Sequence, residues 1–116
     1  MAKENIIIDK TFESSLRIIE LYKYLTIEKK EYILSKQLLK SATSIGANVE
    51  EATAAQSRKG FLSKISIASK EARETTFWLR LLIKSDYITD DGILNNSIEI
   101  KKIITSIVKT TSAQKD

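Results

Sequence analysis

Hydrophobic residues recur at spacings of three and four along most of this 116-residue chain, a period that is typical of amphipathic helices. The pattern predicts helices over about residues 9–25, 31–54, 59–84 and 89–110. Proline is absent and only three glycines are present, so little in the sequence interrupts these helices. We therefore expect an all-α fold.

Each predicted helix has an apolar face suited to a shared core. The face of the first helix comprises Phe12, Leu16, Ile19 and Tyr22, widened by Ile18, Leu21 and Leu25. That of the second comprises Leu34, Leu38, Ser41, Ile45, Val49 and Ala52. The third has the alternating spacings of a bundle or coiled coil, at Phe61, Ile65, Ala68, Ala72, Thr75, Leu79 and Leu82. The fourth has Ile93, Ile100, Ile104 and Ile107, broadened by Leu94, Ile98, Ile103 and Val108.

The connections between the predicted helices are short, which favours antiparallel neighbours. We expect a single domain over residues 1–116, folded as an up-down-up-down four-helix bundle. Ser57 and Thr89 are the predicted N-caps of the third and fourth helices. The apolar faces of the first and fourth helices are wider than a strict seam. Either a short bundle needs broad faces, or one face is buried against another subunit.

Small and polar residues follow one another within the second helix, from Ser41 to Asn48. Glycine, serine, threonine and asparagine all have a lower helix propensity than alanine, so this run does not favour an isolated helix. It makes sense where another backbone comes close, or where buried polar groups find partners. Asn48 and Glu51 are expected to join a polar network that fixes helix register, because an unpaired buried polar group costs about 1–3 kcal/mol.

The same segment resembles a known family. The resemblance rests on the stretch QLLKSATSIGANVEEA and, after it, QSRKGFLSKISIASKEARETTFWLRLL. The residues that carry it are Gln37, Leu38, Ser44, Ile45, Asn48 and Glu51, then Ser57, Ala68, Glu71 and Glu74. They are similar to the signature of the family typified by proteins encoded in intervening sequences of bacterial 23S ribosomal RNA genes. Gly60 departs from the pattern, because close relatives often carry an acid there.

The resemblance implies a cytoplasmic, antiparallel four-helix bundle that assembles into a ring-shaped homopentamer. Most members of the family have no assigned activity. A related branch, the accessory proteins of diversity-generating retroelements, forms basic pentameric barrels that bind nucleic acid and the reverse transcriptase.

The composition argues against several kinds of chemistry. The chain has no histidine and no cysteine, so it lacks the commonest general base near neutral pH, the commonest nitrogen ligand for metals, and any thiolate. A di-iron bundle needs Glu-x-x-His pairs, which cannot be written here. Four acids, Glu50, Glu51, Glu71 and Glu74, leave open a metal site made only of carboxylates, and the alternative is surface ion pairing. We expect no enzymatic activity, no catalytic residues, no metal and no cofactor.

The net charge of +4 is concentrated in one segment. Residues 57–84 contain seven basic and two acidic side chains, whereas residues 85–116 contain four basic and five acidic ones. At about 100° per residue, one outward sector of the third helix holds five cations, namely Lys59, Lys70, Arg73, Arg80 and Lys84. Phe77 shares this sector as a candidate stacking or packing group, and Trp78 is a candidate interface or core anchor.

A row of cations can follow a phosphate backbone, and its repetition around a ring would add avidity, although many such rows are only solvated faces. We predict a homo-oligomer that binds RNA or DNA non-specifically through the five cations. The alternative is a protein-interaction scaffold that docks a partner protein through Phe77 and Trp78. The absence of cysteine fits a reducing cytoplasm. The apolar run at residues 6–8 is too short for a secretory signal or a membrane span, so we expect no membrane partner.

Overall fold

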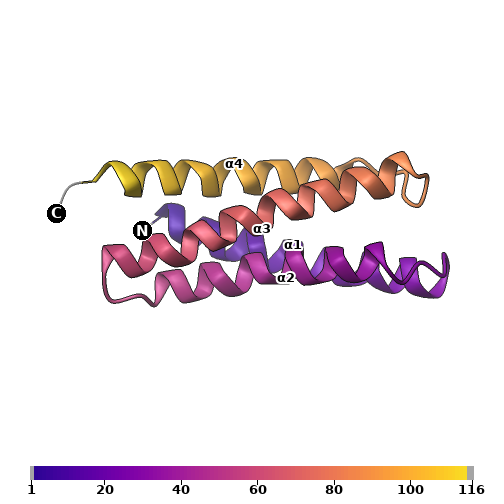
Figure 1. Cartoon of the computed structure of the whole chain (residues 1–116), viewed down its shortest axis with the longest axis horizontal. Coiled ribbons are helices and arrows are strands. Elements are labelled where there is room, and N and C mark those ends of the chain that lie inside the picture. The colour runs from indigo at the N-terminus through magenta and orange to yellow at the C-terminus, as the bar shows by residue number, and fades with distance from the viewer. Residues whose placement is uncertain (1, 115–116) are drawn as a thin grey trace.

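The structure is a computed structural model that describes residues 2–114, and the side chains of residues 6–114. The described residues form four helices: α1 (Ala2–Ile27), α2 (Leu34–Thr53), α3 (Arg58–Lys84) and α4 (Gly92–Ala113). Each helix starts at the end of the molecule where the preceding one stops, so successive helices run in opposite directions (Figure 1). The expected all-α four-helix bundle is confirmed.

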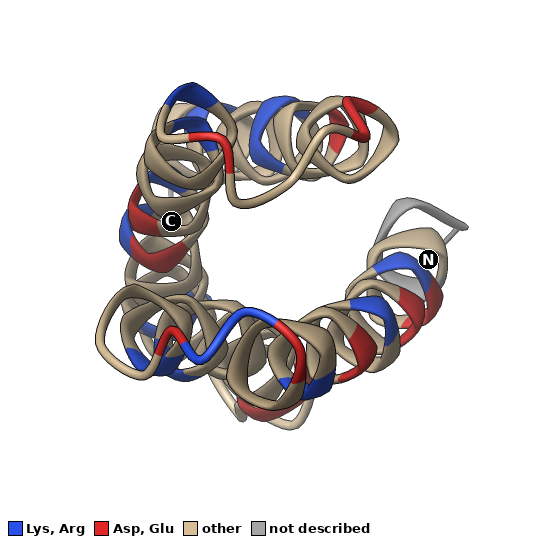
Figure 2. Ribbon diagram, turned by 90° about the vertical axis from the view of Figure 1, so that its right-hand side faces the viewer, with Lys and Arg blue, Asp and Glu red and all other residues tan. Residues whose placement is uncertain are grey.

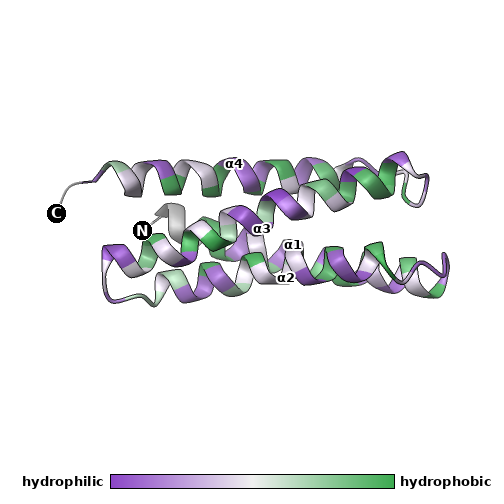
Figure 3. Ribbon diagram, viewed as in Figure 1, coloured by the Kyte–Doolittle hydropathy of each residue, from purple (hydrophilic) through white to green (hydrophobic). Residues whose placement is uncertain are grey.

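The bundle measures 51 × 21 × 20 Å along its principal axes. α2 packs between α1 and α3, and α3 packs against α4, whereas α1 and α4 are the neighbours that contact each other least. Seen along the bundle, the helices surround a common interior and most charged residues lie on their outer sides (Figure 2). Hydrophobic and hydrophilic patches alternate along each ribbon, as expected of amphipathic helices (Figure 3).

Two clusters of buried apolar residues form the core along the length of the bundle. One comprises Ile7, Ile45, Val49, Ala52, Ile65, Ala68, Ala72, Ile100, Ile104 and Ile107. The other comprises Ile18, Leu25, Leu38, Ala42, Leu79, Leu82, Ile88 and Ile93. The apolar faces predicted for α2, α3 and α4 supply most of the first cluster and half of the second. Full burial of one leucine or isoleucine side chain stabilises the fold by roughly 1.5–3 kcal/mol, so these clusters hold the helices together.

The core face predicted for α1 is only partly correct, because it combined residues that are buried with residues that are exposed. Phe12 and Leu16 are 60% and 46% exposed, whereas Ile7, Ile18 and Leu25 are almost fully buried. The helix starts well before residue 9, and this brings Ile7 onto the same face as Ile18 and Leu25. Because α1 is apolar on two sides, the period of its sequence identifies both stripes without indicating which one meets the core.

The small residues of α2 allow a close approach between helices. A Cβ atom on Gly46 would lie 3.5 Å from Ser15 Oγ and 3.7 Å from the carbonyl oxygen of Thr11, both in α1. The Ser15 hydroxyl donates to that same carbonyl at 2.9 Å, so no hydroxyl on this side of α1 is left unpaired at the crossing. The expectation that another backbone comes close to this run is confirmed.

Buried hydroxyls join α3 to α2 on one side and to α4 on the other. Ser41 Oγ on α2 lies 2.9 Å from Thr75 Oγ1 on α3. One residue further along α3, Thr76 Oγ1 lies 2.9 Å from Ser97 Oγ on α4. All four side chains are buried, so α3 is tied to both neighbours at one level of the bundle. Each pair satisfies two hydroxyls that would otherwise be costly to bury.

Polar side chains mark the starts of α3 and α4. Ser57 caps α3 as predicted, because its hydroxyl accepts the Gly60 N–H at 3.0 Å. The predicted cap of α4 is wrong, since that helix begins at Gly92 rather than directly after Thr89. The Asp90 carboxylate accepts the Gly92 N–H at 2.8 Å, and this turn replaces a hydroxyl cap.

Glu31 holds the start of α2. Its carboxylate accepts the N–H groups of Ile33, Leu34 and Ser35 at 3.0, 2.9 and 2.7 Å. Burial is the largest single influence on the Glu31 pKa and raises it, but these bonds and one from the Ser35 hydroxyl together lower the pKa below its ordinary value. Because the carboxylate satisfies three otherwise unpaired N–H groups, α2 begins at Leu34, three residues later than expected.

Candidate nucleic-acid interface

The outer face of α3 presents the predicted row of cations. Its buried residues, from Ile65 to Leu82, all lie on one side of the helix. The five cations are all exposed, and they lie on the opposite side: Lys59, Lys70, Arg73, Arg80 and Lys84. We call this set the α3 cation row. None of the five makes an ion pair that would neutralise it within the described residues.

α4 extends the positive surface in a way that the sequence analysis missed. Lys102 and Lys109 are exposed, and Lys101 is half-buried. Residues 85–116 have a net negative charge, but three of their acids precede the helix, and only Glu99 lies within it. α3 and α4 together carry a net charge of +7, whereas the charges of α1 and α2 cancel. Counting charge by helix would have identified these lysines.

Two shallow grooves lie along this positive half of the bundle. One of about 350 Å³ lies between α3 and α4 and is lined by Ser66, Ser69, Lys70, Arg73, Glu74 and Val108. The other, of about 530 Å³, runs along α4 and is lined by Lys101, Lys102, Thr105, Ser106, Lys109 and Thr110. Lysine, arginine and hydroxyl side chains are the groups that most often contact phosphate oxygens in nucleic-acid complexes.

An aromatic pair lies in the middle of the α3 cation row. Phe77 is 51% exposed, and its ring meets that of Trp78 edge to face, with centroids 5.1 Å apart and an interplanar angle of 72°. Trp78 is half-buried and packs against the core cluster that contains Leu79 and Leu82. Trp78 is thus anchored in its own subunit, and Phe77 is the member of the pair that an external molecule can reach.

Glu71 and Glu74 lie on one flank of α3. Burial, and next the charge of Glu74, raise the pKa of Glu71 above its ordinary value, while Lys70 and Lys40 oppose that rise. The Glu74 charge therefore disfavours the ionised form of Glu71. Among the described residues, no three acidic groups come close enough to form a metal site.

Asn48 and Glu51 make separate contacts. The Asn48 side-chain nitrogen donates to the backbone oxygen and the hydroxyl of Ser44, at 2.9 and 3.1 Å, within its own helix. Glu51 is exposed and pairs with Lys64 of α3 at 2.9 Å. Glu51 thus makes a contact with a neighbouring helix, whereas Asn48 bonds only within α2, so the two residues do not join one network. The buried hydrogen bonds between helices come instead from the paired serine and threonine hydroxyls.

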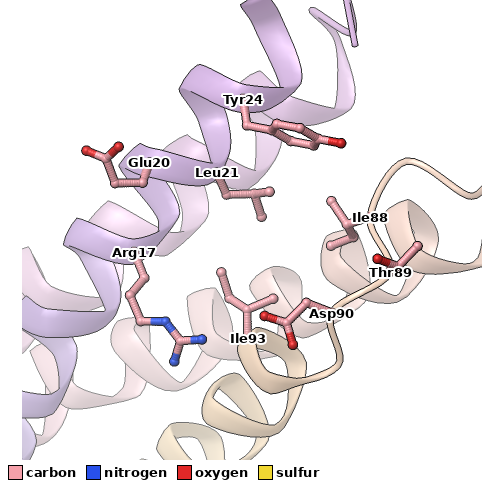
Figure 4. A pocket seen from close by; sticks show the side chains of 8 residues that line it. All are labelled: Arg17, Glu20, Leu21, Tyr24, Ile88, Thr89, Asp90 and Ile93. Atoms are coloured by element: carbon pink, nitrogen blue, oxygen red, sulfur yellow. The ribbon is translucent and has the colours of Figure 1, made fainter. Parts of the chain in front are cut away.

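A cavity of about 430 Å³ lies between α1 and the α3–α4 connection (Figure 4). Leu21, Ile88 and Ile93 form its apolar part, and Arg17, Tyr24 and Asp90 approach from its sides, with Glu20 and Thr89 completing the lining. The lining contains neither a thiol nor an imidazole, so it offers no cysteine–histidine or serine–histidine pair for nucleophilic catalysis.

Comparisons with known proteins place these features in context. A family model described as 23S rRNA-intervening sequence protein matches residues 3–109. The chain is also similar to a crystal structure of a protein with unknown function from the S23 ribosomal protein family of Bacteroides thetaiotaomicron VPI-5482. The two are 52% identical, the match covers 92% of this chain and 98% of that one, and the TM-score is 0.89. No curated protein matches the chain significantly. Within residues 2–114, no helix is long and apolar enough to cross a membrane.

Proposed function

The chain belongs to the 23S rRNA-intervening sequence protein family, and on this basis we propose that it is a non-enzymatic protein that binds RNA or DNA without sequence specificity. The proposed surface is the α3 cation row, extended by the lysines of α4. The observation that carries the proposal is the exposure of five cations on the side of α3 opposite the core.

The chemistry of this surface favours phosphate over base recognition. Long, flexible lysine and arginine side chains reach phosphate oxygens, which are the same at every position of a nucleic acid. Neutralised phosphates release condensed counterions, so the affinity would depend strongly on salt and little on sequence. The lack of histidine and cysteine supports a role in binding rather than catalysis.

We include self-association in the proposal. Phe12 and Leu16 form an apolar stripe on the outer side of α1, where they are exposed in the single chain. Burial of this stripe against a second copy would remove apolar surface from water. A homopentameric ring, which the family resemblance implies, would repeat the basic face and increase avidity for one strand. We expect the protein to act in the cytoplasm.

A second candidate function is favoured by the exposure of Phe77. An aromatic residue at the centre of a surface can anchor a partner protein, and arginines beside it are common in such interfaces. This alternative predicts binding that is largely insensitive to salt, because an apolar contact is not screened.

The test is fluorescence anisotropy of labelled RNA and DNA oligonucleotides, titrated with the purified protein at low salt. A variant with Arg73→Glu and Arg80→Glu reverses two charges of the row, and we expect it to weaken binding by at least tenfold. The control variant, Lys23→Glu with Lys36→Glu, changes the net charge equally on exposed positions of α1 and α2, and it should bind nearly as the wild type does. Absence of binding by the wild type would favour the protein-docking alternative.

A further inference from the structure

The form of nucleic acid that fits this face can be inferred from the surroundings of Phe77, and the inference rests on the proposed function. Phe77 is half exposed in the middle of the α3 cation row. Arg73 lies about one turn before it and Arg80 about one turn after it, whereas Lys70 and Lys84 lie about two turns away. An accessible aromatic ring therefore has cations on both sides of it along the helix.

The Phe77 ring has a defined position. Trp78 touches it edge to face, and Trp78 is itself packed against the core. In such a pair, Trp78 can cover at most one face of the Phe77 ring, and about half of the Phe77 side chain is exposed to a stacking partner. A ring that is already fixed loses little conformational entropy when a ligand stacks on it.

The charges on the two sides of Phe77 are unequal. On a helical wheel of about 100° per residue, Arg73 and Arg80 lie roughly 40–60° from Phe77 on the side that faces α4. Glu74 lies roughly 60° away on the other side of the wheel, and it is the one acid that lines the groove between α3 and α4. Phosphates are therefore attracted to the α3–α4 boundary, and the bases attached to them can lie toward Phe77.

We propose that this face prefers single-stranded to double-stranded nucleic acid, because Phe77 stacks on an unpaired base while the neighbouring cations hold adjacent phosphates. In a duplex the bases already stack on one another, so the ring finds no free face and only the charges contribute. A single strand provides both contacts. Every base has a flat face, so stacking of this kind tolerates any sequence.

The test compares single-stranded and duplex oligonucleotides of equal length at one salt concentration, by anisotropy. Charge alone favours the duplex, because its phosphates are more closely spaced. Tighter binding of the single strand therefore reports stacking. We expect Phe77→Ala to weaken single-strand binding by about tenfold and to change duplex binding by less than about twofold. Phe77→Leu, which keeps apolar bulk without the ring, should behave like Phe77→Ala.

The matched control is Ile67→Ala, which removes another exposed apolar side chain of α3, and it should change neither affinity. Circular dichroism verifies that each variant is folded. Trp78 is the only tryptophan, so its emission gives a second readout next to the stacking ring. Single strands should quench this emission more than duplexes do.

Equal affinity of the wild type for the two forms would overturn the inference, as would an equal loss of both affinities in Phe77→Ala. Either result would leave the proposed function standing, because binding through the cations would persist. Absence of binding to both forms would instead contradict the proposed function and this inference together.

Discussion

The hydroxyl of Ser41 on α2 lies 2.9 Å from the hydroxyl of Thr75 on α3, and both residues are almost fully buried. Each hydroxyl also lies near a carbonyl oxygen of its own helix, Thr75 Oγ1 at 2.8 Å from that of Glu71 and Ser41 Oγ at 3.2 Å from that of Leu38, so either one can donate the bond between the helices. This contact and its neighbour between Thr76 and Ser97 fix how α3 sits against α2 and α4.

Thr75→Val keeps the shape of the side chain and removes the hydroxyl. We expect it to lower the free energy of unfolding by about 1–2 kcal/mol, because Ser41 loses its partner in the core. Urea denaturation measures this loss. The control is Thr43→Val, since the Thr43 hydroxyl bonds only within its own helix, to the Leu39 carbonyl at 2.8 Å. An equal cost for both substitutions would mean that the bond between helices adds nothing.

Glu31→Gln tests the cap of α2. The pKa of Glu31 is lower in the folded protein than its ordinary value of 4.5, so the carboxylate stabilises the fold above that pH and loses this effect as the pH falls through its folded pKa. We expect the variant to be less stable than the wild type by about 1–2 kcal/mol at pH 7. The difference should shrink below about pH 4.

Thermal unfolding of both proteins at pH 7 and at pH 3 measures this change. Glu28→Gln, in the same connection, is the control, because Glu28 is exposed. A difference between wild type and Glu31→Gln that stays constant with pH would show that the carboxylate charge is not what holds the helix start.

Gly46 tests how closely α1 approaches α2. A Cβ atom there would make ordinary contacts of 3.5–3.7 Å with Ser15 and Thr11. Gly46→Ala should therefore stabilise the protein by about 0.5–1 kcal/mol through helix propensity. Gly46→Val adds two further methyl groups toward α1 and should destabilise it by about 1–3 kcal/mol. Equal free energies of unfolding for the two variants in urea would contradict this, because they would mean that α1 and α2 can move apart without cost to make room for the larger side chain.

The exposed stripe of α1 tests self-association. Replacement of Phe12 and Leu16 together by glutamine should barely change the stability of the single chain, because both side chains are exposed in it. Light scattering after size exclusion should show a smaller mass than that of the wild type. Ile33→Gln, at a 74% exposed position away from the stripe, is the control. An unchanged mass in the stripe variant would place any subunit interface elsewhere.

Much of the fold could be predicted because the spacing of the apolar residues indicates where the helices lie and which of their faces are buried. The buried seam of α3, from Ile65 to Leu82, follows directly from its alternation of threes and fours. The same rule was only partly correct for α1: it included Ile18 and Leu25, which are buried, but also Phe12, which belongs to a second apolar stripe that the period cannot distinguish from the first. The cap of α4 was missed because the Asp90 carboxylate, and not the Thr89 hydroxyl, accepts the Gly92 N–H.

The candidate site could be predicted only in part. The α3 cation row was visible because its members share one side of a single helix. Lys102 and Lys109 of α4 were hidden, because acids in the preceding connection cancel their charge when a whole segment is counted. That α4 packs against α3, and so adds its lysines to the same half of the bundle, depends on how two helices pack. The pairing of Ser41 with Thr75 also depends on how the helices pack, so it cannot be predicted from the spacing of residues within one helix.

The most direct test of the central claim is the salt dependence of nucleic-acid affinity, measured by anisotropy from low to physiological salt. Each neutralised phosphate adds roughly 0.7–0.9 to the slope of log affinity against log salt concentration. We predict a steep slope for the wild type, and one that is shallower by about 1.5 for the variant with Arg73→Glu and Arg80→Glu. A flat slope for the wild type, or equal slopes for both proteins, would contradict binding through the α3 cation row.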